Sequence, residues 1–156
     1  IKLDKKNFQS FYSLGIVYAH LQNYDKAIEN YKKALSLDNE SSVAHNNLAN
    51  IYNKINPNQA EDHYLKVIEL TPNDVMPYIN ISNYYLKNTK YKKCVAMLEK
   101  ALTQELYSKE LYNNLGIAYY ATKENVKAKN MFESAVGIDP NYKPALDNLK
   151  NIQDLS

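Results

Sequence analysis

The sequence contains few of the residues that make turns, disulfides or metal sites. Among its 156 residues are three glycines, five prolines, one cysteine and no tryptophan. A β-sandwich or barrel needs many tight turns built from glycine and proline, so this shortage disfavours both and favours helices. The single cysteine, Cys94, excludes a disulfide framework within the chain and a zinc site built from several cysteines.

Arginine is also absent, and all 19 basic side chains are lysines. Nucleic-acid binding usually relies on clustered positive charge and on bidentate arginine contacts. Here 17 acidic residues almost balance the lysines, and the local run Lys90, Lys92 and Lys93 is interpreted as the solvated start of a helix. We therefore expect no nucleic-acid partner.

Long apolar runs and targeting signals are missing as well. No apolar stretch approaches the roughly 20 residues that cross a bilayer, and no secretory signal is visible. We therefore expect no membrane insertion and an intracellular, cytoplasmic location. The chain begins at Ile1 without a methionine, which suggests a piece of a longer protein with further repeats upstream.

What the sequence does contain is a repeat. A set of an aromatic residue or histidine, a leucine or isoleucine, a small residue and a tyrosine occurs four times. Steps of 34, 33 and 34 residues separate the successive leucine or isoleucine positions, and a further 34 lead to Leu149. The four sets are Phe11, Leu14, Gly15 and Tyr18; His45, Leu48, Ala49 and Tyr52; Tyr78, Ile81, Ser82 and Tyr85; and Tyr112, Leu115, Gly116 and Tyr119. A second half-motif of a small residue and a larger one follows each set: Ala27 and Tyr31, Ala60 and Tyr64, Cys94 and Leu98, Ala128 and Phe132.

The spacing indicates pairs of packed helices. Residues three and four apart lie on one face of a helix, so each set forms an apolar stripe. The small residue next to the leucine lets a second helix approach closely, and the second half-motif offers its own small residue at the crossing. No single hairpin can bury such faces alone, so we expect neighbouring hairpins to stack.

This pattern is similar to the tetratricopeptide repeat, W-x2-L-G-x2-Y followed by A-x3-F and P at a period of 34. The resemblance covers nearly the whole chain. It implies an all-α fold, a right-handed superhelix of four helical hairpins plus a C-terminal capping helix. The expected units are 8–41, 42–74, 75–108 and 109–142, preceded by the tail of an earlier repeat at 1–7 and followed by the capping helix at 143–156.

Within these units we place a first and a second helix each. The first helices are expected near 8–21, 42–54, 75–88 and 109–122, and the second near 25–37, 58–70, 91–103 and 125–138. In the second unit the turn is one residue shorter, and Asn56-Pro57 supplies a cap followed by proline at the first helical position. In the last stretch Lys150 stands where the small residue should follow Leu149, which indicates a capping helix with one polar face.

Catalytic motifs are not found. There is no phosphate-binding glycine loop, zinc-binding helix motif or nucleophile elbow, so we expect no enzymatic activity, cofactor or metal. His45 occupies the aromatic position of the motif and Cys94 the small-residue position, so both are assigned to packing. His20, near the end of a first helix, makes no metal site alone.

Two polar columns of the first helices carry the functional prediction. The residue before each motif leucine or isoleucine is asparagine in four of five cases, and a second column follows three residues later. In the family's superhelix this face of the first helix lines the concave surface. Asparagine is a mediocre helix former, but its amide both donates and accepts hydrogen bonds, as a peptide bond does. The first column is Ser13, Asn47, Asn80, Asn114 and Asn148, and the second is Ile16, Asn50, Asn83, Ile117 and Asn151.

These columns predict an asparagine ladder that holds an extended polypeptide by its backbone. The alternative is a solvated surface, because asparagine is frequent throughout this sequence. The predicted peptide-binding residues are Tyr12, Ser13, Asn46, Asn47, Asn50, Lys54, Asn80, Asn83, Lys87, Asn113, Asn114, Asn148 and Asn151.

The ladder and the stretches Ala44–Asn50 and Leu111–Gly116 resemble the superhelical repeats of O-linked N-acetylglucosamine transferases. In that family asparagines at this place hold substrate polypeptides. By contrast, the carboxylate-clamp group that grips acidic chaperone tails needs lysine and arginine in the groove. Here the equivalent positions are Tyr12, Ile16, Asn47, Met76 and Asn80, which disfavours a clamp.

Three hypotheses follow. The chain is a protein-interaction scaffold that binds an extended or partly helical peptide, the substrate-docking arm of such a transferase whose catalytic domain lies elsewhere, or a self-associating array in a larger assembly. The sequence leaves the partner and the oligomeric state open.

Overall fold

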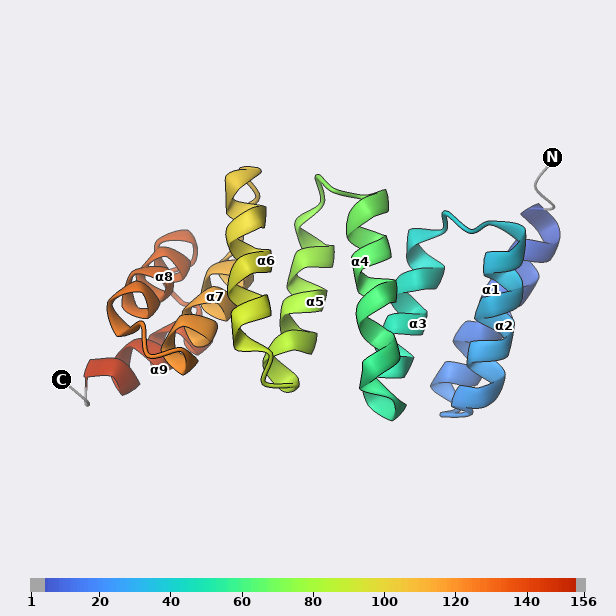
Figure 1. Ribbon diagram of the computed structural model, residues 1–156, viewed down its shortest axis with the longest axis horizontal. Coiled ribbons are helices and arrows are strands. Elements are labelled where there is room, and N and C mark those ends of the chain that lie inside the picture. The colour runs from blue at the N-terminus through green and yellow to red at the C-terminus, as the bar shows by residue number, and fades with distance from the viewer. Residues whose placement is uncertain (1–4, 154–156) are drawn as a thin grey trace. The chain divides into compact units, whose positions relative to one another are not determined.

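The computed structural model describes residues 5–153, which form nine α-helices and one short 3-10 helix and contain no strand (Figure 1). In none of these helices is an apolar segment long enough to cross a membrane. The elements are α1 (Lys5–His20), α2 (Tyr24–Leu37), α3 (Ser42–Ile55), η1 (Pro57–Gln59), α4 (Ala60–Leu70), α5 (Val75–Lys87), α6 (Tyr91–Thr103), α7 (Lys109–Ala121), α8 (Asn125–Ile138) and α9 (Lys143–Gln153).

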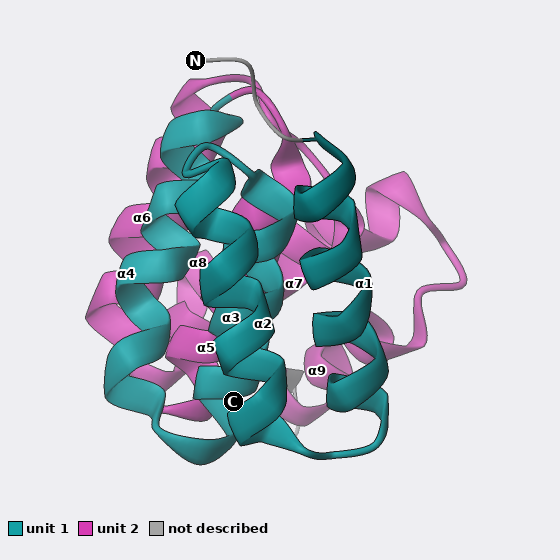
Figure 2. Cartoon of the chain, turned by 90° about the vertical axis from the view of Figure 1, so that its right-hand side faces the viewer, with its two compact units in different colours: residues 1–72 teal, residues 73–156 magenta. Residues whose placement is uncertain are grey.

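The helices belong to two compact units, which Figure 2 colours separately. Unit 1 ends at Pro72 and contains α1 to α4, and unit 2 begins at Asn73 and contains α5 to α9. Within each unit, consecutive helices pack as hairpins, α1 with α2 and α3 with α4, then α5 with α6 and α7 with α8. The predicted all-α architecture of four hairpins and a closing helix is confirmed.

The start of the first helix differs from the prediction. Residues 1–7 were expected to be the tail of an earlier repeat, but α1 already begins at Lys5. Lys5, Lys6 and Asn7 contain no helix breaker, so they extend the first helix by one turn. Residues 1–4 of the expected tail lie outside the described part of the chain.

The first helices of three hairpins end in the same way, although no glycine is present. Gln22, Thr89 and Lys123 follow α1, α5 and α7 with φ values of 57°, 55° and 66°. In each case this residue donates to the carbonyl three positions earlier, and the next residue donates to the carbonyl five positions earlier. This bonding satisfies carbonyls that a helix end leaves without partners. The second hairpin instead uses Asn56 and the 3-10 helix η1. The prediction placed Asn56 and Pro57 at the start of the second helix itself, but α4 begins at Ala60 and the Asn56 side chain makes no capping bond.

Helix crossings explain the small residues of the motif. A Cβ atom added to Gly15 would lie 2.6 Å from Cδ1 of Tyr31, and one added to Gly116 would lie 2.5 Å from Cε1 of Phe132. Both distances are far below a normal contact, so the aromatic side chain of each second helix occupies the space that glycine leaves. The motif therefore specifies the hairpins by direct packing.

One motif position is not buried as expected. Leu14 is 44% exposed, whereas the equivalent Leu48 is fully buried. Leu48 lies on α3, which packs against α2 as well as α4. Among the described helices none precedes α1, so the corresponding face of α1 remains open.

Candidate functional site

The predicted asparagine columns lie on the first helices, but most of their amides bond to neighbouring first helices. In unit 2, Nδ2 of Asn114 donates to Oγ of Ser82 and to Oδ1 of Asn83, both at 2.8 Å. Nδ2 of Asn148 donates to Oδ1 of Asn113 at 3.0 Å. These bonds join α5 to α7 and α7 to α9, so in unit 2 the column links helices of the same unit.

Burial corrects part of the predicted site. Asn113 and Asn114 are only 5% and 8% exposed, so they do not line an open surface. They were placed on an exposed face because the repeat pattern does not reveal the polar partners one repeat away. The other predicted residues remain accessible to different extents. Ser13, Asn50, Lys54, Asn83, Lys87 and Asn151 are exposed, and Tyr12, Asn46, Asn47, Asn80 and Asn148 are half-buried.

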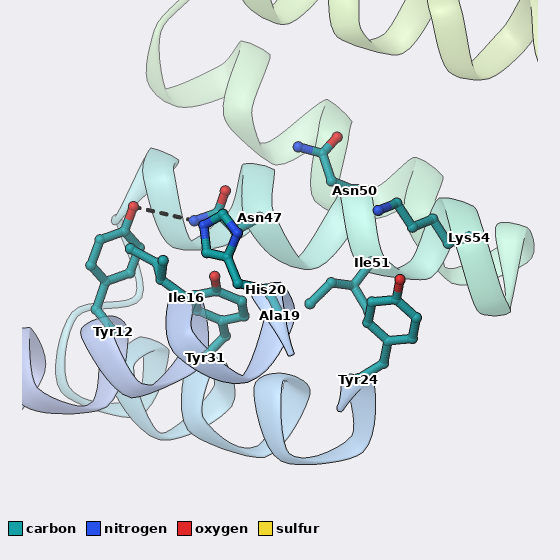
Figure 3. Close-up of a pocket in the computed structure, with 10 residues that line it drawn as sticks. All are labelled: Tyr12, Ile16, Ala19, His20, Tyr24, Tyr31, Asn47, Asn50, Ile51 and Lys54. Carbon is teal, nitrogen blue, oxygen red and sulfur yellow. Dashed lines mark hydrogen bonds between the residues drawn. The ribbon is translucent and has the colours of Figure 1, made fainter. Parts of the chain in front are cut away.

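Unit 1 has a different arrangement, because there the column borders a pocket of about 520 Å³ between α1, α2 and α3 (Figure 3). Four predicted residues converge on it: Tyr12 from α1 and Asn47, Asn50 and Lys54 from α3. The remaining lining residues are Ile16, Ala19, His20, Tyr24, Tyr31 and Ile51.

Hydrogen bonds hold the polar side of this pocket. Nδ2 of Asn47 donates to the hydroxyl of Tyr12 at 3.2 Å, across the two first helices. Oδ1 of Asn50 accepts a 2.7 Å hydrogen bond from the hydroxyl of Tyr64 on α4, a bond that does not involve the Asn50 amide nitrogen. The two amides thus have fixed orientations at the pocket wall.

The charge in the pocket is positive. The ammonium of Lys54 lies 5.7 Å from the centre of the Tyr24 ring, a cation–π contact. Burial raises the pKa of the Tyr31 hydroxyl to about 12, so this residue stays neutral at physiological pH. No aspartate or glutamate is among the described residues that line the pocket. Its chemistry is that of a binding site, with amides, hydroxyls, an ammonium and apolar surface.

A second polar cluster, the pair His45 and His63, joins α3 to α4. Their Nδ1 atoms are 2.9 Å apart, and Nε2 of His45 lies 3.1 Å from the carbonyl oxygen of Asn39. Because a carbonyl only accepts, His45 must carry its hydrogen on Nε2, and a neutral His45 then accepts at Nδ1 from His63. Burial, and then the neighbouring His45, lower the pKa of His63. From the sequence we assigned His45 to packing, and the repeat motif does not indicate the hydrogen bond between His45 and His63.

Other expectations about chemistry remain predictions. Across residues 5–153, no three histidine, cysteine, aspartate or glutamate side chains gather closely enough to hold a metal ion. Cys94 is fully buried at a helix crossing, and burial raises the pKa of its thiol to about 12, which makes it a poor nucleophile at neutral pH.

Family models described as tetratricopeptide repeat match residues 8–41, 77–105 and 109–142. Together these segments cover more than half of the chain. A curated relative, the type IV pilus assembly protein PilF of Pseudomonas aeruginosa, is 24% identical over 147 residues. The match covers 90% of this chain but only 58% of PilF.

Solved structures share the fold over nearly the whole chain. The crystal structure of the MamA protein superposes with a TM-score of 0.82 at 20% identity, and the match covers 96% of this chain and 82% of MamA. YrrB, described as a TPR protein with an unusual peptide-binding site, has a TM-score of 0.76 at 24% identity, over 94% of this chain and 76% of YrrB. At such identities the likeness shows the fold alone.

Proposed function

Because the chain belongs to the tetratricopeptide repeat family, we propose that it is a protein-interaction scaffold that binds an extended polypeptide with its first helices. The observation that carries this proposal is the pocket of unit 1, where Tyr12, Asn47, Asn50 and Lys54 converge. Its volume of about 520 Å³ lies within the range of small-ligand sites, roughly 300–1,000 Å³, and can accept one or two side chains of a peptide.

In this proposal fewer asparagines of the ladder contact the peptide than the sequence predicted. Asn47 and Asn50 border the pocket, and the amide oxygen of Asn47 and the amide nitrogen of Asn50 take no part in the bonds to Tyr12 and Tyr64, so they can accept from and donate to a peptide bond. Asn113 and Asn114 are occupied by bonds inside unit 2 and serve its packing. We therefore assign peptide contact first to unit 1, and contact by Ser13, Asn46, Asn80, Asn83, Lys87, Asn148 and Asn151 remains a hypothesis.

The other two hypotheses each involve a second component. A substrate-docking arm of a glycosyltransferase acts together with a catalytic domain. A self-associating array requires a complementary face on a second copy. The peptide-binding proposal requires only the pocket, and YrrB, a protein of the same fold, is described as having a peptide-binding site.

A random peptide library displayed on phage tests the proposal. The chain is the bait, and the double variant Asn47→Ala/Asn50→Ala is the counter-selection bait. We expect peptides that are enriched on the wild type and lost on the double variant. Asn130→Ala, at an exposed asparagine of the second helix α8 outside the predicted site, is the matched control and should retain them.

Circular dichroism melting of all three proteins establishes that the pocket variants remain folded. Peptides that bind the double variant as well as the wild type, or a library without any enriched peptide, would refute peptide binding at this pocket.

A further inference from the structure

Among the helices of unit 1, acidic residues lie only on the second helices. The first helices α1 and α3 contain no aspartate or glutamate, and they carry Lys5, Lys6 and Lys54. The acidic residues of the hairpin helices lie on the second helices α2 and α4: Asp25, Glu29, Glu61, Asp62 and Glu69. A ligand lying along the first helices of unit 1 therefore meets positive side chains and no carboxylate from those helices.

Two lysines of the second helices, Lys33 and Lys66, have acidic partners. Nζ of Lys33 lies 2.6 Å from Glu29, and Nζ of Lys66 lies 2.7 Å from Glu69. The ammonium of Lys54 instead lies over the ring of Tyr24, at the edge of the pocket. Its exposed side chain keeps a positive charge that a ligand carboxylate can neutralise.

The floor of the same pocket is apolar. Ile16 and Ala19 of α1 and Ile51 of α3 line it together with the Tyr12 and Tyr24 rings, as Figure 3 shows. An aliphatic or aromatic side chain fits this surface, since it would leave water for apolar contacts. The pocket thus combines an apolar floor with a cationic edge.

We propose that this pocket selects acidic peptides, in which an apolar side chain enters between Ile16 and Ile51 and a nearby aspartate or glutamate pairs with Lys54. This inference rests on the proposed peptide-binding function and adds the chemical class of the ligand. In an extended peptide, side chains two residues apart point to the same side at a spacing of about 7 Å. An apolar and an acidic residue separated by one residue therefore face the pocket together, and we assign this spacing to the ligand.

Two fluorescein-labelled dodecapeptides test the inference by fluorescence anisotropy. Both carry a leucine and, two positions further on and so on the same side of an extended chain, a test residue, with neutral residues elsewhere; they differ only in having glutamate or glutamine at the test position. We expect the glutamate peptide to bind about tenfold more tightly at low ionic strength, and this preference should shrink in high salt, which screens exposed charges.

Charge-reversal variants test whether Lys54 causes the preference for the glutamate peptide. Lys54→Glu should abolish the preference for the glutamate peptide and leave the glutamine peptide nearly unaffected. Lys100→Glu, the same charge change on an exposed lysine of α6, should preserve it.

The outcomes separate this inference from the proposed function. Equal binding of the two peptides would overturn acidic selectivity while peptide binding stands. A preference that survives Lys54→Glu would overturn the role of Lys54. If neither dodecapeptide binds, acidic selectivity is refuted, and the library selection still decides peptide binding independently, because it imposes no composition on the ligand.

Discussion

A single side chain, Asn114 of α7, bonds to two residues of the neighbouring first helix α5 in unit 2. It is 8% exposed, and its amide nitrogen donates to Ser82 and to Asn83. The hydroxyl of Ser82 also donates to the carbonyl of Ile79 at 2.8 Å, so the network reaches the backbone of α5. In an environment nearly free of water, such bonds contribute more than an exposed amide does.

Replacing Asn114 therefore separates a packing role from a ligand-binding role. Asn114→Ala should lower the free energy of unfolding by about 1–3 kcal/mol, because it leaves the buried Ser82 hydroxyl without the donor that it has in the wild type. Asn151→Ala removes an exposed amide of α9, so its effect should stay within about 0.5 kcal/mol. Urea denaturation of the two variants gives both values. Equal stability of the two would mean that Asn114 faces solvent, as the sequence pattern alone suggested.

At the scale of elements, the helix ends carry strain that the sequence does not relieve with glycine. Thr89 ends α5 at a φ of 55°, a left-handed conformation that is unfavourable for a β-branched residue. Gln22 has the same role after α1 at 57°, but its side chain is not branched at Cβ. Both residues are exposed, so their side chains add little packing to offset the strain.

Glycine at these ends should stabilise the protein. We expect Thr89→Gly to raise the free energy of unfolding by about 1 kcal/mol, since an L-residue in this region costs about 1–2 kcal/mol and glycine gives back part of that in chain entropy. Gln22→Gly should give a smaller gain. Differential scanning calorimetry measures both, and a lower melting temperature for Thr89→Gly would contradict the strain argument.

The pair of histidines makes the second hairpin sensitive to pH. The folded state lowers the pKa of His63, so between the unfolded pKa and the folded pKa the unfolded chain binds more protons. The stability contributed by neutral His63 is therefore present above the unfolded pKa, near 6.5, and is lost as pH falls towards the folded pKa.

The free energy of unfolding should accordingly decrease from pH 7.5 to pH 5, with a slope of at most about 1.4 kcal/mol per pH unit for this one proton. His63→Gln, which has no titrating ring, should flatten the profile over the same range. Urea denaturation at several pH values measures both curves. A His63→Gln profile as steep as that of the wild type would show that other groups cause the pH dependence.

For the molecule as a whole, the period of the sequence predicted the hairpins well because the repeated contacts are local. Gly15 against Tyr31 and Gly116 against Phe132 are contacts between the two helices of one hairpin, and the motif encodes both partners. The candidate site was predicted less completely. An asparagine such as Asn114 looks the same in sequence whether its amide faces a ligand or a neighbouring helix.

The pocket of unit 1 also contains residues that could not be predicted from the sequence. Four of its residues, Tyr12, Asn47, Asn50 and Lys54, were among the peptide-binding residues predicted on the first helices. Tyr24 and Tyr31 were not, because they come from the second helix and reach the pocket only through the packing of α2 against α1 and α3. A pattern read within one helix cannot supply residues that another helix contributes.

The last prediction follows from the dependence of each repeat on its neighbours. In a stacked array the same motif position contributes stability only where an adjacent helix covers it. Leu48 is fully buried, so Leu48→Ala should lower the free energy of unfolding by about 2–5 kcal/mol. Leu14 is 44% exposed, so Leu14→Ala should cost under about 1 kcal/mol, although both leucines occupy the same place in the motif.

Urea denaturation of Leu48→Ala and Leu14→Ala measures the two losses of stability, with circular dichroism as the probe of helix content. The contrast depends on coverage by a neighbouring helix, because helix propensity changes equally in the two substitutions. Two further leucines test whether coverage is the cause. Leu115 of α7, a motif leucine, is 1% exposed and should behave like Leu48, and Leu146 of α9, three residues before the motif Leu149, is 41% exposed and should behave like Leu14. If all four substitutions cost the same, the motif leucines would stabilise each hairpin from within, and stacking of neighbours would not be what holds this array together.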